Sequence, residues 1–268
     1  MLVLRSLLFN AAFFGGGLLF ALLLVPCLVL SRTTMQRGLK AWAAGTMWAL
    51  EHIAGLTWEI KGQENLPDQP CIFACKHQSA WETGIFYLLV GDPSYILKKE
   101  LLSIPFFGWY IAHAGAIAID RKAGASALKS MISGTKERLE RGQNVIIFPE
   151  GTRAAPGKPG TYHPGIAALY KGVDAPVVPV ALNSGLFWQR RSFLKRPGRI
   201  TLEFLPAIEP GQNRRAFMTD LQSRMEDATN RLIADGRAQF PHALPAAIST
   251  DEAYDAASED APSKTPPA

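Results

Sequence analysis

The sequence predicts an α/β protein, with a largely parallel or mixed central sheet flanked by helices, behind an N-terminal membrane-anchoring helical segment. Two observations lead to this prediction. From residue 71 onward, apolar runs of about four to six residues alternate with helix-like segments, the pattern of strands buried on both faces. Before them lies an uncharged run of 24 residues, 7–30. A chain of 268 residues suits one globular domain with appendages.

The run 7–30 predicts a membrane anchor. It consists mainly of Leu, Phe, Ala, Val and Gly and exceeds the roughly 20 residues that cross a hydrocarbon core. A cleaved signal peptide has a shorter apolar core, of about 7–15 residues, and the stretch 31–34 is a poor cleavage site. Three consecutive glycines, 15–17, and Pro26 would serve the core helix of a soluble protein poorly.

The flanking charges predict how the anchor is oriented. Three basic residues follow the run at 32, 37 and 40, whereas only Arg5 precedes it, which favours a cytoplasmic C-terminal side. A second apolar stretch, 39–56, is interrupted by charged and polar residues and flanked by tryptophans, as interfacial helices are. The anchor is therefore either a transmembrane or a re-entrant helix plus an interfacial helix. We expect a protein of the cytoplasmic (inner) membrane whose catalytic domain faces the cytoplasm.

The remaining elements follow from local patterns. Strands are expected at 71–75, 95–97, 116–119, 145–148, 177–182 and 200–204. Helices are expected at 81–90, 123–141, 164–170 and 214–240, with an aromatic turn at 104–109. The expected domains are an anchor at 1–58, a catalytic domain at 59–241 and a disordered acidic Ala/Pro-rich tail at 242–268.

Composition limits the functional classes. The tail 242–268 holds five acidic residues and one lysine, a balance of −4, which leaves +9 on the remainder of a chain whose net charge is +5. A basic body favours an anionic partner, and the anchor favours a membrane surface over nucleic acid. Three cysteines make no disulfide framework, and Cys71, Cys75 and His77 lack a fourth ligand for zinc, so no metal is expected. No Gly-x-Ser-x-Gly elbow of an α/β-hydrolase is present.

A histidine and a carboxylate stand five positions apart where the first strand ends. On one continuous helix His77 and Glu82 would lie ~140° apart and would not meet. They pair only if His77 precedes the helix and Glu82 occupies its first turn, where the helix dipole favours a carboxylate. Glu82 then orients one imidazole nitrogen and leaves the other to accept a proton as general base. A structural histidine is the competing interpretation of this pair alone.

A second polar cluster follows another strand. In the segment Phe-Pro-Glu-Gly-Thr-Arg at 148–153, Gly151 permits close backbone approach, Thr152 offers a hydroxyl and Arg153 a donor fork suited to phosphate. Arg121 ends another strand and offers a second fork. Because ligands collect at the carboxyl ends of parallel strands, these groups predict an anion site beside the base. Surface arginines beside ordinary turns are the alternative.

Four blocks together resemble the glycerolipid acyltransferase family, whose best-known members are 1-acyl-sn-glycerol-3-phosphate acyltransferases. The family's His-x4-Asp block is similar to His77 to Glu82, with Glu in place of the usual Asp. Its other blocks are similar to Gly115 to Arg121, to the segment 148–153 and to Val-Pro-Val at 178–180. The resemblance covers roughly residues 61–205, and the block at 148–153 is highly specific.

The resemblance implies transfer of a fatty acyl group from an acyl thioester to the sn-2 hydroxyl of lysophosphatidic acid, giving phosphatidic acid for phospholipid biosynthesis. It implies His77 as base oriented by Glu82, with Arg153, Thr152 and Arg121 holding the phosphate and Glu150 and Gly151 shaping the site. No cofactor is expected, with acyl-CoA or acyl carrier protein as co-substrate. The alternatives are another acceptor, such as a lyso-amino-acid lipid, or a non-enzymatic membrane lipid-binding protein.

Overall fold

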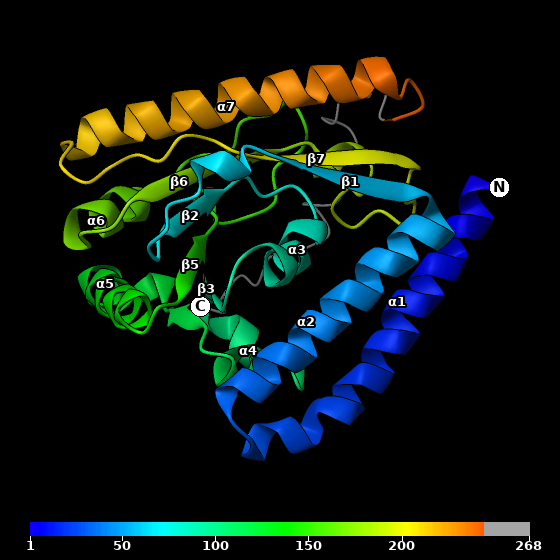
Figure 1. Ribbon diagram of the computed structural model, residues 1–268, viewed down its shortest axis with the longest axis horizontal. Helices are drawn as coiled ribbons and strands as arrows, with labels where there is room; N and C mark the ends of the chain where they lie inside the picture. The colour runs from blue at the N-terminus through cyan, green and yellow to red at the C-terminus, as the bar shows by residue number, and fades with distance from the viewer. Residues whose placement is uncertain (244–268) are drawn as a thin grey trace, which may run out of the picture.

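Seven strands form one sheet in the order β1-β7-β6-β2-β5-β3-β4, in a computed structural model that describes residues 1–243 (Figure 1). Neighbouring strands are parallel except β6 and β7, which are antiparallel. The predicted largely parallel or mixed sheet is therefore confirmed. The strands are β1 Leu56–Lys61, β2 Ile72–Cys75, β3 Pro93–Lys98, β4 Ile117–Ile119, β5 Asn144–Ile147, β6 Val177–Leu182 and β7 Gly198–Phe204.

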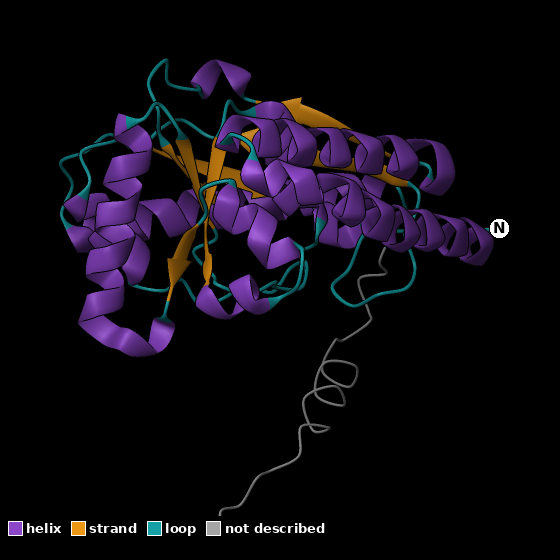
Figure 2. Ribbon diagram, turned by 90° about the horizontal axis from the view of Figure 1, so that it is seen from below, coloured by secondary structure: helices purple, strands orange, loops and turns teal. Residues whose placement is uncertain are grey.

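Helices cover both faces of the sheet, as Figure 2 shows by the purple ribbons around the orange strands. The expected tail at 242–268 lies almost wholly outside the described residues. The α-helices are α1 Leu2–Leu24, α2 Arg32–Ala49, α3 Trp81–Leu89, α4 Phe107–His113, α5 Gly124–Glu140, α6 Gly165–Gly172 and α7 Arg214–Gln239. Among the short helical turns, η1 Val25–Val29 joins α1 to α2, η2 Leu50–Ala54 joins α2 to β1, and η4 Lys99–Ser103 joins β3 to α4.

The central strands divide their side chains between two apolar clusters. In β2, Ile72 and Ala74 pack in the cluster that contains the buried side chains of α6 and the first half of α7. Phe73 and Cys75 pack in the other cluster, which contains the buried side chains of α3. Successive side chains of a strand point to opposite faces, so a four-residue apolar strand serves two cores at once. This explains why β2 is a continuous apolar run without alternation.

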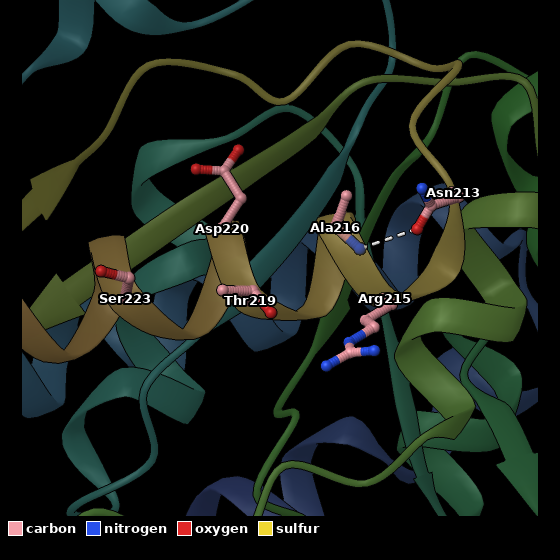
Figure 3. A pocket seen from close by; sticks show the side chains of 6 residues that line it. All are labelled: Asn213, Arg215, Ala216, Thr219, Asp220 and Ser223. Carbon is pink, nitrogen blue, oxygen red and sulfur yellow. Dashed lines mark hydrogen bonds between the residues drawn. The ribbon is translucent and has the colours of Figure 1, made fainter.

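Helix α7 lies along one face of the sheet, over β6 (Figure 1). Its buried side chains recur at helical spacing, among them Phe217, Leu221 and Met225. Asn213 caps its N-terminus, since the side-chain oxygen accepts a hydrogen bond from the amide of Ala216, which Figure 3 shows. A shallow depression over these first turns contains none of the site residues expected from the sequence; its lining residues are Asn213, Arg215, Ala216, Thr219, Asp220 and Ser223.

Two elements differ from the sequence-based expectation. Strand β1 pairs with β7 at the edge of the sheet and spans the domain boundary expected at 58–59, which therefore cuts through a strand. The aromatic turn expected at 104–109 instead contains the start of α4. Tertiary contacts stabilise that helix, because Tyr110 packs with Leu24 and Met35 of the first two helices. At its start, Phe106 adopts a positive φ of 61°, and Gly108 lies against the backbone of Leu102. Local composition does not encode this arrangement.

The first two helices form a hairpin on the body of the protein (Figures 1 and 2). The helix Leu2–Val29 is long and apolar enough to cross a membrane, and only 6% of its most apolar window is buried. Both ends of the hairpin's first helix contact the body. Near its start, the amide of Lys195 donates to Ser6 Oγ at 2.9 Å. Near its end, the hydroxyl of Tyr110 donates to the carbonyl of Ala21.

The backbone around Gly108 generates a stability prediction. A Cβ at this position would lie 2.2 Å from the carbonyl oxygen of Leu102, so Gly108→Ala forces the backbone of α4 and η4 apart. We expect the free energy of unfolding to fall by about 3 kcal/mol, measured by thermal unfolding in detergent. Gly91→Ala is the control, because nothing lies within 4 Å of a Cβ there. Equal stability of the two variants would contradict this packing.

Candidate active site

The turn between β2 and α3 brings His77 and Glu82 together. Strand β2 ends at Cys75 and α3 begins at Trp81, so His77 precedes the helix and Glu82 occupies its first turn. His77 Nδ1 lies 2.9 Å from Glu82 Oε1, which confirms the expected contact across a strand-to-helix turn. The Glu82 side chain is fully buried, whereas that of His77 is 14% exposed. Nδ1 thus donates to the carboxylate, and Nε2 is the nitrogen that remains for a substrate.

Five hydrogen bonds hold the Glu82 carboxylate. Besides His77, the amides of Gln78 and Ser79 donate to Oε1, each at 2.6 Å. The hydroxyls of Ser79 and Ser184 donate to Oε2, at 2.7 and 2.9 Å. Burial acts to raise the pKa of Glu82, but the hydrogen bond and charge of His77 and the hydrogen bonds of Ser79 outweigh it and hold the pKa below its usual range. The carboxylate therefore stays ionised and fixes the imidazole.

The Glu150 carboxylate joins the two segments that the sequence singled out. Its Oε2 accepts the amide hydrogen of His77 at 3.1 Å, and its Oε1 accepts that of Gly160 at 3.0 Å. In return, the amide of Ala154 donates to the carbonyl of His77 at 2.8 Å. The Phe148 ring stacks on the imidazole, with centroids 4.1 Å apart and planes 20° from parallel. These contacts are available because β2 and β5 are adjacent parallel strands that end at the same edge.

The basic residues gather at that same edge. Gly151 has a φ of 65°, a conformation that favours glycine, and its carbonyl accepts a hydrogen bond from Arg121 Nη2 at 3.1 Å. Burial, and then the positive charge of Arg190, lower the pKa of Arg153, which the Glu82 carboxylate opposes. Arg121 thus bonds to the turn, Arg153 interacts electrostatically with the carboxylate of the dyad, and Thr152 is exposed on the same turn. Two guanidinium groups and a hydroxyl are donors that can bind an anion.

Several residues that contact the site were not singled out from the sequence. Lys76 is buried and its ammonium contacts Glu150 at 2.5 Å and Glu226 of α7 at 2.7 Å. Ser184, after β6, reaches Glu82 across 102 positions of sequence. A lysine directly after an apolar strand was the available sign for Lys76. No local pattern distinguishes Glu226 from the many charged residues of α7.

The cysteines of β2 offer little competing chemistry. Burial raises the pKa of Cys71 to about 12 and raises that of Cys75 well above its usual range, so both thiols stay protonated. Across residues 1–243, no group of three or more His, Cys, Asp or Glu side chains is placed to hold a metal ion. The polar chemistry of this edge of the sheet therefore centres on His77 and the basic turn.

Comparisons with known proteins agree with one another. A family model described as Acyltransferase matches residues 57–183. A 1-acyl-sn-glycerol-3-phosphate acyltransferase of Pseudomonas aeruginosa is 36% identical to this chain, over 87% of the chain and 90% of that relative. The 1-acyl-sn-glycerol-3-phosphate acyltransferase alpha of Ovis aries is 29% identical, over 75% and 70%.

Among solved structures, the 1-acyl-sn-glycerophosphate (LPA) acyltransferase PlsC of Thermotoga maritima is similar to this chain. The two structures match with a TM-score of 0.70, over 87% of this chain and 99% of the Thermotoga chain. Their sequences are 20% identical, so this similarity shows a shared fold.

The hydrogen bonds around the Glu82 carboxylate lead to a prediction about the stability of the fold at low pH. A pKa below the usual 4.5 means that the fold binds the ionised carboxylate preferentially. Its contribution is complete above the unfolded-state pKa and is lost as pH falls through the folded-state pKa. At neutral pH, Glu82→Gln should lower the free energy of unfolding by about 2–3 kcal/mol. Thermal unfolding measured from pH 7 downward should show this difference shrinking below pH ~4.5.

The control for this series is Glu137→Gln, an exposed carboxylate of α5. Its difference from the unmodified protein should be small throughout. A Glu82→Gln deficit that stays constant down to pH ~3 would contradict an ionised, hydrogen-bonded Glu82.

Proposed function

The chain belongs to the acyltransferase family and is an O-acyltransferase; on that premise we propose that it acylates the sn-2 hydroxyl of 1-acyl-glycerol-3-phosphate, giving phosphatidic acid. The observation that carries this proposal is the geometry of His77, whose Nδ1 is committed to a buried carboxylate 2.9 Å away. Its Nε2 is then the acceptor for a hydroxyl proton, beside a turn that carries Arg153.

The proposed reaction has two proton transfers and no acyl-enzyme. His77 Nε2 takes the proton of the acceptor hydroxyl while the hydroxyl oxygen attacks the thioester carbonyl carbon. The carbon–sulfur bond then breaks, and the leaving thiolate takes the proton from the imidazolium, which yields an ester and a free thiol. Glu82 keeps its charge throughout, because it stabilises the imidazolium that forms between the two steps. The five donors around its carboxylate hold that charge in place.

The acceptor phosphate is proposed to bind at the basic turn. Arg153 and Arg121 supply planar forks that suit the oxygens of a phosphate monoester, and Thr152 supplies a hydroxyl. The positive φ of Gly151 opens the backbone of the turn to a close approach by the anion. Glu150 accepts the amide hydrogen of His77, so the distance between phosphate site and base is held by the turn itself. A 1-acyl-glycerol-3-phosphate bound here presents its sn-2 hydroxyl to the imidazole.

The acyl donor is proposed to be a thioester of coenzyme A or of acyl carrier protein. The chemistry described above needs no further cofactor, because the thioester carbonyl is already activated and the base is part of the chain. The two donors share the reacting thioester and differ in what carries it. An assay with both donors therefore distinguishes them without changing the mechanism.

We also propose that the enzyme works on the cytoplasmic membrane with one apolar face in the bilayer. In the part of the chain that the structure describes, exposed large apolar side chains occur at 1–30, at Trp48 and Trp58, at 101–109 and at Phe193, whereas α5, α6 and α7 carry none. Segment 101–109 adjoins the hairpin turn, where His113 Nε2 lies 3.0 Å from the carbonyl of Leu30. Exposed apolar surface of this extent suits a lipid environment.

The contacts at both ends of α1 support a re-entrant hairpin over a single span. A helix that crossed the bilayer would separate one end from the body. The bonds of Ser6 with Lys195 and of Ala21 with Tyr110 join both halves of α1 to the same domain. An in-plane hairpin retains both sets of contacts, and we propose that the catalytic domain faces the cytoplasm, in line with the basic residues that follow the apolar run.

The function is tested by an acyl-transfer assay on the purified, detergent-solubilised protein. Lysophosphatidic acid, other lysolipids and a monoacylglycerol that lacks the phosphate are each offered with acyl-CoA and with acyl carrier protein. We expect transfer to lysophosphatidic acid, and loss of at least ~1,000-fold in kcat for His77→Ala, because the base is gone. Co-sedimentation with membranes should be unchanged in this variant.

The matched control is His52→Ala, since His52 is an exposed histidine of η2 that stacks on Trp48. It should retain both activity and membrane association. Turnover in His77→Ala at the level of the unmodified enzyme would exclude the proposed base. A preference for a lysolipid without a phosphate monoester would reassign the acceptor, and lipid binding without any turnover would exclude an enzyme.

The proposed membrane face leads to a separate test with Phe107→Ser/Trp109→Ser. Both side chains are about half exposed, at 49% and 48%, and each should contribute about 1 kcal/mol when it enters the lipid interface. Together they make about 2 kcal/mol, so vesicle association of the double variant should weaken roughly 30-fold. Transfer to a water-soluble short-chain acceptor should persist, which separates weakened docking from misfolding. Unchanged vesicle affinity would contradict insertion of this segment.

A further inference from the structure

A lysine with almost no solvent contact lies next to the proposed base. Lys76 has an exposed fraction of 2% and follows a strand whose residues are all buried. Its ammonium contacts Glu150 Oε1 at 2.5 Å and Glu226 Oε1 at 2.7 Å, and it lies 5.7 Å from the ring centroid of Tyr162. Tyr162 closes the cluster, since its hydroxyl donates to Glu226 at 2.9 Å. Four segments of the chain therefore meet at one ammonium group.

Stability alone explains this cluster poorly. Lysine is almost never fully buried unless it is paired, and a buried ion pair often contributes no more stability than apolar residues of similar volume. The three groups together carry a net negative charge, because one lysine faces two carboxylates. Burial and the neighbouring carboxylates raise the pKa of Tyr162, which keeps its hydroxyl as a donor. Because burying these charged groups costs free energy, the cluster points to a role in the reaction.

The connection to the base runs through one carboxylate. Lys76 and the amide of Gly160 donate to Oε1 of Glu150, and the amide of His77 donates to Oε2. Glu150 is thus held from both sides, and its orientation fixes the backbone of His77 against the turn at 148–153. Without the ammonium, Glu150 would be a buried carboxylate with amide donors alone, and it would turn away toward water.

We propose that Lys76 is a positioning residue for the acyl-transfer reaction, which holds Glu150 and ties the base and the phosphate-binding turn to Glu226 of α7. This inference rests on the proposed function for its kinetic consequences. Its charge acts as well, since Lys76 offsets negative charge beside His77. The other charged groups around His77 are Glu82 from α3, Glu150 from the β5 turn and Arg153, which interacts electrostatically with Glu82.

The variants Lys76→Met, Lys76→Arg, Glu226→Gln and Lys76→Met/Glu226→Gln test both the position and the charge. A displacement of the base by about 1 Å costs ~100-fold in rate, so kcat of Lys76→Met should fall by that order. Lys76→Arg should recover part of it, because it keeps the cation. The exposed Lys61, which pairs with Glu59 on β1, gives the control Lys61→Met.

The pH profile of kcat/KM distinguishes positioning from a general loosening of the fold. Lys76→Met removes a positive charge near the base, which makes the base easier to protonate. The acidic side of the kcat/KM profile, its acid limb, should therefore move to higher pH by about one unit. Glu226→Gln removes a negative charge, so the limb should move to lower pH. The double variant has the net charge of the unmodified cluster, and its limb should return to the original position. A loss of kcat with no movement of the limb in any variant would overturn the proposal.

Hydrogen exchange measured by mass spectrometry gives a readout that does not depend on activity. In Lys76→Met, exchange should rise at 76–80 and 149–154, while that of α5 stays as it is. Unchanged exchange in both segments would overturn the inference, whatever the kinetics. If instead the unmodified protein transfers no acyl group while the exchange changes appear, the proposed function fails and the structural role of Lys76 stands.

Discussion

The Glu82 carboxylate is the group on which the geometry of the site depends. It lies in the first turn of α3, fully buried, and accepts five hydrogen bonds from the preceding turn, from His77 and from Ser184 after β6. A buried carboxylate with fewer donors would take up a proton, and the imidazole would lose its orienting partner. The glutamate side chain reaches back into the strand-to-helix turn. Ser184, which follows β6, lies beside that turn and donates to the carboxylate.

A second constraint is the order of the strands. Strands β2 and β5 are parallel neighbours, so the turns that follow them meet at one edge of the sheet. Glu150 and Ala154 from one turn then bond to the two backbone polar groups of His77 from the other. The base and the basic turn consequently behave as one rigid unit, which suits a reaction that requires both ends of an acceptor to be held. Lys76 extends this unit to α7.

The anchor and the site share structural elements as well. The loop after β6 carries Ser184, which bonds to Glu82, and further on Phe193 and Lys195, which bond to α1. The hairpin of α1 and α2 therefore contacts the same loop that supplies Ser184 to the Glu82 carboxylate. Under the proposed function, an amphiphilic acceptor in the bilayer would meet a site whose supporting loop is itself held by the apolar helix α1.

Much of the fold followed from local patterns, because the period of apolar residues sets the type of an element. Strand β6 at 177–182 occurs where it was expected, and α3, α5 and α7 agree to within two residues at each end. Strand β1 and helix α4 were not foreseen. The residues of β1 do alternate between apolar and polar at 56–61, the period of a half-buried strand, but the expected domain boundary at 58–59 divided that pattern. Helix α4 depends on packing under the hairpin turn, which its own sequence does not indicate.

For the site, the sequence by itself determined the chemistry: a histidine and a carboxylate that meet only across a turn, and a Gly-Thr-Arg segment suited to an anion. Spacing and residue type suffice for this, because both are local properties of the chain. Only the tertiary structure decided which distant groups complete it. Ser184 and Glu226 lie 102 and 150 positions from Glu82 and Lys76, and the strand order together with the packing of α7 on β6 brings them within hydrogen-bonding distance. Contacts of that separation depend on how the sheet is wound, which no local pattern records.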